Sequence, residues 1–119
     1  MFWRKKKPKY QTTQVTDTNF NELVAQSEVP VLLDFYADWC GPCQTLLPTI
    51  EKLATEYEGE VEILKVNVDE QRELASVFAV RSIPSIFFIK GNTVTDKLKG
   101  LTTESTLRNK IEDLKSFAA

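Results

Sequence analysis

The sequence contains no histidine, only two cysteines and no long run of apolar residues. Histidine is the usual general base at neutral pH and the commonest metal ligand, so its absence excludes many hydrolytic and metal-dependent mechanisms. Two cysteines supply only half of the ligands of an ordinary zinc site, which would then need a second chain or two carboxylates. No stretch approaches the roughly 18 apolar residues of a membrane-spanning helix. We therefore expect neither a metal centre nor a spanning helix.

Charge is distributed unevenly along the chain. Residues 1–10 hold five basic side chains and no acidic one, whereas the rest of the chain carries ten basic and seventeen acidic side chains, a net charge of −7. An acidic body disfavours nucleic-acid binding by the fold itself. We expect residues 1–10 to be a disordered basic extension. The alternative is a surface tether, in which Phe2 and Trp3 enter a membrane interface and the basic run meets anionic lipid.

The first residues lack an apolar stretch after their positive charges, which is not the layout of a secretory signal. If this is the native N-terminus, we expect a cytoplasmic protein. In that compartment a closely spaced cysteine pair is more often catalytic or metal-binding than a structural disulfide. The length of 119 residues suits one compact domain, which we assign to residues 11–119.

Short apolar runs predict strands that are buried on both faces. These strands are expected at Val31–Tyr36, Val61–Val66 and Ile86–Ile89, with another at Thr93–Leu98 after a Lys90-Gly91-Asn92 turn. Helical spacing of apolar residues predicts a helix after Asp17 as its cap, a long helix at 46–57, a short one at 74–78, and a last one at 107–114 capped by Thr102 or Thr103. Crossover helices and a final hairpin predict an α/β fold with a central mixed sheet.

The cysteines lie in the segment Trp39-Cys40-Gly41-Pro42-Cys43, between a predicted strand and the long helix. A C-x-x-C in this position is typical of a dithiol–disulfide site. A helix that begins near Cys40 directs free N–H groups and the positive end of its dipole at the Cys40 sulfur, which lowers the pKa of the thiol. We predict that Cys40 is the nucleophile. Cys43 lies on the same face three residues later, and we expect it to be the more enclosed, resolving thiol.

The residues around the cysteines fit this chemistry. Gly41 lets a partner approach the backbone, Pro42 fixes φ at an early helical position, and Trp39 offers a flat apolar contact. A purely structural disulfide between residues three apart would close too short a loop to stabilise the fold appreciably. We therefore favour a redox-active pair over a structural disulfide or a zinc site.

A carboxylate, Asp34, interrupts the first apolar run. By side-chain alternation it shares a face with Leu32 and Tyr36, which favours burial over the alternative of a solvent-facing strand end. Burial raises the pKa of a carboxyl group, which suits a proton acceptor for Cys43. Lys65, inside the neighbouring run, is either the partner of Asp34 or a lysine at the edge of the sheet.

The segment Asp34–Cys43 resembles the active-site segment of the thioredoxin family, and Ile83-Pro84-Ser85 resembles the cis-proline loop of that family. The similarity extends from about Thr13 to Phe117. It implies the thioredoxin fold, with about five strands in a central mixed sheet and four flanking helices. Tyr36 departs from the pattern, because many members have tryptophan there.

The resemblance also implies roles for particular residues. Pro84 would be cis and would pack against the cysteine pair, while the Ile83 backbone would pair with the substrate chain. Gly100 would lie on the same binding surface. Asp34 and Lys65 match the buried carboxylate of the family and its neighbouring lysine, which modulates it.

The function implied by the resemblance is that of a monomeric protein-disulfide oxidoreductase, which reduces target proteins through a mixed disulfide. Such a domain would bind no cofactor, because an NADPH-dependent flavoprotein, thioredoxin reductase, would supply its electrons. Its partners would be that reductase and disulfide-containing targets. A binding or scaffold module with a non-redox role stays open as an alternative, whereas Gly41 and Pro42 disfavour an oxidase or isomerase.

Overall fold

A mixed β-sheet forms the centre of the structure, a computed structural model that describes residues 12–118. The expected basic extension at residues 1–10 lies outside the described residues. In chain order, the elements are β1 (Thr13–Gln14), the π-helix η1 (Asn21–Ala25), β2 (Val31–Tyr36), α1 (Gly41–Glu56), β3 (Glu62–Asn67), α2 (Arg72–Val77), β4 (Ser85–Lys90), β5 (Thr93–Lys99) and α3 (Glu104–Ser116).

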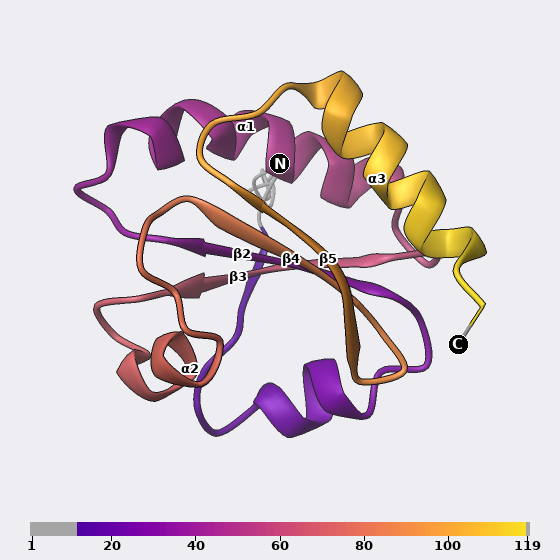
Figure 1. Cartoon of the computed structure of the whole chain (residues 1–119), viewed down its shortest axis with the longest axis horizontal. Helices are drawn as coiled ribbons and strands as arrows, with labels where there is room; N and C mark the ends of the chain where they lie inside the picture. Colours follow the sequence, from indigo (N-terminus) through magenta and orange to yellow (C-terminus); the bar gives the residue numbers. More distant parts are fainter. Residues whose placement is uncertain (1–11, 119) are drawn as a thin grey trace, which may run out of the picture.

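The five strands lie in the order β1-β3-β2-β4-β5. β3 runs parallel to both β1 and β2, whereas β4 runs antiparallel to β2 and β5. Helices α1 and α3 cover one face of the sheet, and η1 and α2 cover the other (Figure 1). The predicted α/β architecture of a mixed sheet flanked by four helices is confirmed.

Each face of the sheet packs against its helices through an apolar cluster. On the α1 and α3 side, the cluster includes Leu32 and Phe88 from the sheet together with Ile50 and Ile111 from the helices. The second cluster joins the opposite face to η1 and α2. Because β2 lies between β3 and β4, all six of its residues are buried. The near-continuous apolar run of this strand therefore matches its position in the middle of the sheet.

Ion pairs link α1 to α3 across the surface of their shared side. Arg108 on α3 bonds both Glu56 of α1 and Glu104 of α3, and Lys52 of α1 lies 3.2 Å from Glu104. Such partly exposed pairs contribute little to stability individually, but here they share partners between two adjacent helices.

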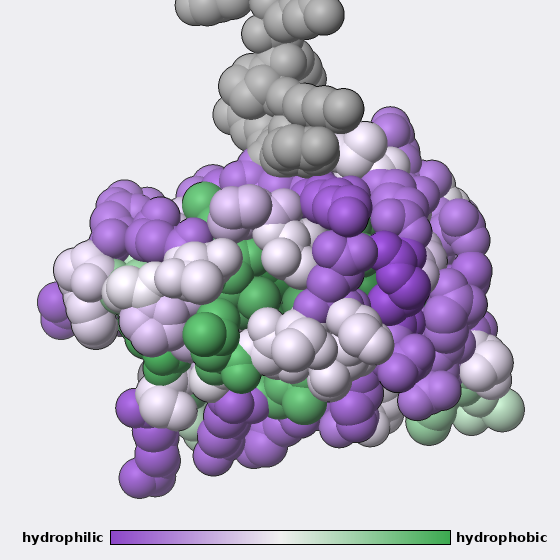
Figure 2. Space-filling model, turned by 90° about the horizontal axis from the view of Figure 1, so that it is seen from above, coloured by the Kyte–Doolittle hydropathy of each residue, from purple (hydrophilic) through white to green (hydrophobic). Residues whose placement is uncertain are grey.

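Figure 2 shows hydrophilic atoms gathered on the right of the face that α1 and α3 cover, where α3 lies, and hydrophobic atoms near its middle. Among residues 12–118, none of the helices combines the length and the hydrophobicity that a membrane span requires.

The start of η1 differs from the sequence prediction. Asp17 does not cap this helix, whose N-cap is Phe20 with no side-chain cap. The Oδ1 atom of Asp17 instead accepts a hydrogen bond of 3.2 Å from the backbone N–H of Leu74, near the start of α2. Thr103 is confirmed as the cap of α3, because its hydroxyl accepts the N–H of Thr106.

The hairpin between β4 and β5 turns at Gly91 and Asn92, as the sequence predicts. Both residues have positive φ, 59° and 62°. These are the two residue types that adopt this conformation most readily, and two consecutive positive φ angles suit the right-handed twist of a hairpin. The hairpin gives the sheet its antiparallel edge, β5.

Candidate active site

The two cysteines lie where β2 leads into α1. Cys40 is the N-cap of the helix, and its sulfur accepts a hydrogen bond of 3.2 Å from the backbone N–H of Cys43. Pro42 occupies the first turn, where a missing N–H costs no helical hydrogen bond. Cys40 and Cys43 form a disulfide. The prediction that a helix begins at Cys40 and presents its N-terminus to this sulfur is confirmed.

Exposure does not distinguish the two cysteines. Each is 4% exposed, so the expected greater enclosure of Cys43 is not seen in the disulfide form. Both pack in one small cluster with Tyr36 and Ala37 at the end of β2. The disulfide therefore lies in a mostly apolar setting at the N-terminus of α1.

The loop before β4 reaches the cysteines from the other side. The Ile83–Pro84 peptide bond is cis, and the Ile83 carbonyl oxygen lies 3.8 Å from the Cys40 sulfur. The backbone N–H of Gly100 donates to the Pro84 carbonyl at 2.8 Å. Gly100 has a φ of 84°, a conformation that favours glycine. The fold thus gathers Cys40, Ile83, Pro84 and Gly100 from three separate segments.

Trp39 lies on the outside of this group and is 71% exposed. Its indole Nε1–H donates a hydrogen bond of 2.7 Å to Oδ2 of Asp69. Asp69 is held in turn by Asn67, whose side-chain oxygen accepts the N–H groups of Asp69 and Glu70. Asp69 was not predicted from the sequence. An asparagine at a strand end signals such a turn, but no local pattern indicates the contact across thirty residues.

Asp34 lies within β2 and is only 2% exposed, so the prediction of burial is confirmed and a solvent-facing strand end is excluded. Burial raises the pKa of its carboxyl group from 3.8 to about 7, and the nearby charge of Lys65 partly opposes this rise. Asp34 Oδ1 makes no hydrogen bond with any other residue within 12–118. A carboxyl group in this setting can gain or lose a proton near neutral pH.

Lys65 is the direct neighbour of Asp34 across the β2–β3 ladder. Because β1 also pairs with β3 at this residue, Lys65 is not at the edge of the sheet. The sequence left open whether Lys65 is the partner of Asp34 or a lysine at the edge of the sheet. The structure supports the first of these roles. Lys65 therefore lies within the sheet beside Asp34.

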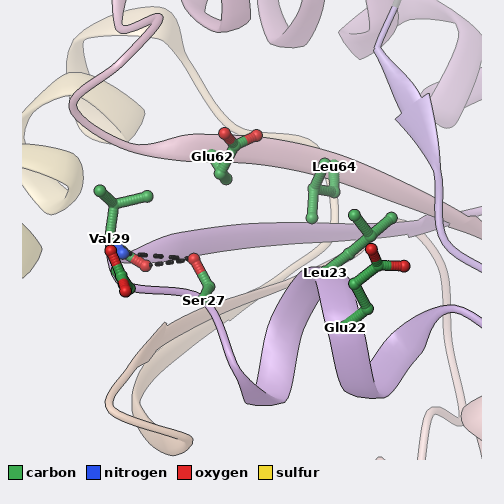
Figure 3. A pocket seen from close by; sticks show the side chains of 7 residues that line it. Glu22, Leu23, Ser27, Val29, Glu62 and Leu64 are labelled. Carbon is green, nitrogen blue, oxygen red and sulfur yellow. Dashed lines mark hydrogen bonds between the residues drawn. The ribbon is translucent and has the colours of Figure 1, made fainter.

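A hollow elsewhere on the surface does not belong to this site. It lies between η1 and the first half of β3, and its lining includes Glu22, Leu23, Glu62 and Leu64 (Figure 3). β2 and β3 run parallel, and the cysteines follow the far end of β2. The hollow and the disulfide are therefore at opposite ends of these strands.

Comparison with known proteins gives consistent matches. The family model described as Thioredoxin matches residues 11–113. The chain is 42% identical over 99 residues to Thioredoxin 1 of Nostoc sp., a match that covers 83% of this chain and 92% of that protein. It is 42% identical over 93 residues to Thioredoxin of Rickettsia felis, covering 78% and 89%. With the chloroplastic M-type thioredoxin of Pisum sativum it shares 43% identity over 98 residues, 82% of this chain and 57% of that protein.

Proposed function

The chain belongs to the thioredoxin family and is a thiol–disulfide oxidoreductase, and from this premise we propose that it works as a reductase of disulfides in other proteins. The observation that carries the proposal is the Cys40–Cys43 pair at the N-terminus of α1. The helix dipole and the Cys43 N–H both favour a thiolate on Cys40, and the thiolate is the form that attacks a disulfide.

The reaction has two exchange steps. The Cys40 thiolate of the reduced protein attacks one sulfur of a target disulfide, so that a Cys40–target bond forms while the target disulfide breaks. The sulfur that leaves takes up a proton. Cys43 then attacks the Cys40 sulfur, forms the Cys40–Cys43 disulfide and releases the second target sulfur as a thiol. The dithiol has supplied the two electrons that reduce the target.

Asp34 is the proposed proton acceptor for Cys43 before the second step. The raised pKa of its buried carboxyl group, about 7, supports this role because the group can accept a proton near neutral pH. Lys65 is the proposed modulator, since its positive charge opposes the effect of burial on Asp34. Neither residue needs to contact the target.

The proposed substrate-binding surface surrounds Cys40. Trp39, Gly41 and Pro42 are exposed beside the nucleophile and offer an uncharged contact area. The backbone of Ile83, next to Pro84, would pair with an extended target chain in the manner of an added strand. Gly100 would border this surface, because its N–H is bonded to Pro84. These positions support recognition through backbone and apolar contacts rather than one specific side chain.

A reductase must itself be reduced after each turnover. We propose that an NADPH-dependent flavoprotein, a thioredoxin reductase, returns two electrons to the Cys40–Cys43 disulfide, so that the domain itself needs no cofactor. We further propose that residues 11–119 act as a monomeric domain in the cytoplasm, where dithiols are kept reduced.

Reduction of insulin with NADPH and a thioredoxin reductase tests the proposal. The wild-type chain should consume NADPH and precipitate the insulin B chain. Cys40→Ser should abolish turnover, and Cys43→Ser should accumulate a mixed disulfide with the target. Thr45→Ser, a conservative change on the exposed side of the same helix, is the matched control and should keep full turnover. Turnover by Cys40→Ser at the wild-type rate would refute the assignment of the nucleophile.

A further inference from the structure

Polar residues on three adjacent strands lie side by side within the sheet. Gln14 on β1 is paired with Lys65 on β3, and Lys65 is paired with Asp34 on β2. Paired residues of parallel strands project from the same face, and Tyr36, two residues after Asp34, shares that face as well. The four side chains therefore occupy one connected area on the face that also carries Leu32 and packs against α1.

Tyr36 and Gln14 are joined across the intervening strand. The Gln14 side-chain amide donates a hydrogen bond to the Tyr36 hydroxyl, although β3 lies between their strands. The Nζ atom of Lys65, on β3, lies 5.6 Å from the centroid of the Tyr36 ring, within the range of a cation–π contact. The ring and the amide together thus form a strap over the lysine side chain.

We propose that Tyr36 is a positioning residue. The hydrogen bond from Gln14 holds its hydroxyl, and its ring holds the Lys65 ammonium beside Asp34. In this way Tyr36 controls proton transfer from Cys43 to Asp34. The inference rests on the proposed role of Asp34 as the proton acceptor. Tyr36 suits this task because it contacts both parts of the site. Its ring covers Lys65, and it packs in the same apolar cluster as Cys40 and Cys43.

The position of the Lys65 ammonium matters because its charge lowers the pKa of the Asp34 carboxyl group. A Coulomb interaction weakens with distance, and it weakens further when the charge moves into water. A lysine side chain has four flexible bonds, so an unrestrained ammonium would spend more time in solvent. A strap that confines the ammonium keeps its effect on the carboxyl group.

Few other groups act on Asp34 from the neighbouring elements. On β4 its partner is the apolar Ile86. The buried side chains that α1 presents are Leu46, Ile50 and Leu53, together with the titratable thiol of Cys43. On its own strand, Tyr36 is the other titratable residue of this face. A change in the strap should therefore reach Asp34 through the Lys65 charge.

Titration of the Asp34 carboxyl carbon by NMR in the reduced full-length protein tests the inference. Gln14→Ala removes the hydrogen bond to the Tyr36 hydroxyl without changing the Tyr36 ring, and Tyr36→Phe removes only the hydroxyl. Both should raise the Asp34 midpoint by about 0.5 pH unit, roughly a threefold change in proton affinity. Lys65→Met should raise it further in the same direction. Thr13→Ala, an exposed neighbour of Gln14 on β1, is the matched control and should leave the midpoint unchanged.

Combining variants separates positioning from a general structural effect. Gln14→Ala should have no additional effect in a Lys65→Met background, because the charge that the strap positions is then absent. An equal shift in both backgrounds would overturn the inference, and so would unchanged midpoints in both Gln14→Ala and Tyr36→Phe.

The pH dependence of the second exchange step should change together with the titration of Asp34. The rate at which Cys43 releases the target should show a pH midpoint that moves with the Asp34 midpoint in Gln14→Ala. If Asp34→Asn leaves this pH profile intact, the proposed role of Asp34 is wrong and the inference fails with it. If Asp34→Asn alters the profile and Gln14→Ala does not, only the inference is overturned.

Discussion

Replacing Asp34 with asparagine should stabilise the protein at neutral and alkaline pH but not at acidic pH. The unfolded chain loses the Asp34 proton near pH 3.8, whereas the folded protein keeps it up to about pH 7. Between these values the folded state binds more protons, so its stability falls as the pH rises. The difference of about 3 pH units corresponds to about 4 kcal/mol once Asp34 is fully ionised. Asparagine has nearly the same shape and never becomes charged.

Urea unfolding of the oxidised protein at intervals from pH 4 to pH 9 measures this effect. The free energy of unfolding of Asp34→Asn, relative to wild type, should rise by about 4 kcal/mol between pH 4 and pH 8 and then level off. Asp38→Asn, which removes an exposed carboxylate of the active-site loop, is the control for the loss of an aspartate charge that is not buried. A constant difference for Asp34→Asn would refute the claim that burial penalises this charge.

Three further changes test other parts of the structure. Phe88→Ala, at a side chain with no exposed surface, should cost about 3–5 kcal/mol in urea unfolding, and a loss below 1 kcal/mol would contradict its place in the core. Gly100→Ala should cost about 1–2 kcal/mol and slow insulin reduction, because alanine is strained at a φ of 84° beside Pro84; unchanged values would show that the glycine is not required. Asp69→Ala should free the Trp39 indole, so that its N–H exchanges faster with water in NMR while stability changes by less than about 1 kcal/mol. An unchanged exchange rate would mean that this hydrogen bond does not hold Trp39.

Local pattern was enough to predict the main elements and the centre of the site. The apolar run of β2 follows from its burial on both faces, and the alternation within it correctly indicated that Asp34 faces the core. The helix start at Cys40 follows from the sequence between the cysteines, because Pro42 suits a first turn. In each case the controlling interaction lies within a few residues in the sequence.

Contacts between distant segments were not predictable in this way. β1 is only two residues long, too short to produce a recognisable alternation. Asp17 was interpreted as the cap of the helix that follows it, but its side chain accepts a hydrogen bond from Leu74, fifty-seven residues away. The contact between Gln14 and Tyr36 likewise depends on β1 and β2 flanking the same strand. Such contacts depend on the packing of the whole sheet, which a single sequence does not encode locally.

The proposed reaction depends on stabilisation of the Cys40 thiolate by the N-terminus of α1. The pH dependence of Cys40 alkylation by iodoacetamide in the reduced protein, with the modified residue identified by mass spectrometry, measures this stabilisation. We predict a midpoint for Cys40 well below the value of about 8.5 of a free cysteine, with Cys43 reacting far more slowly. A midpoint near 8.5, with no faster reaction than that of a free thiol, would contradict the claim that the N-terminus of α1 activates Cys40.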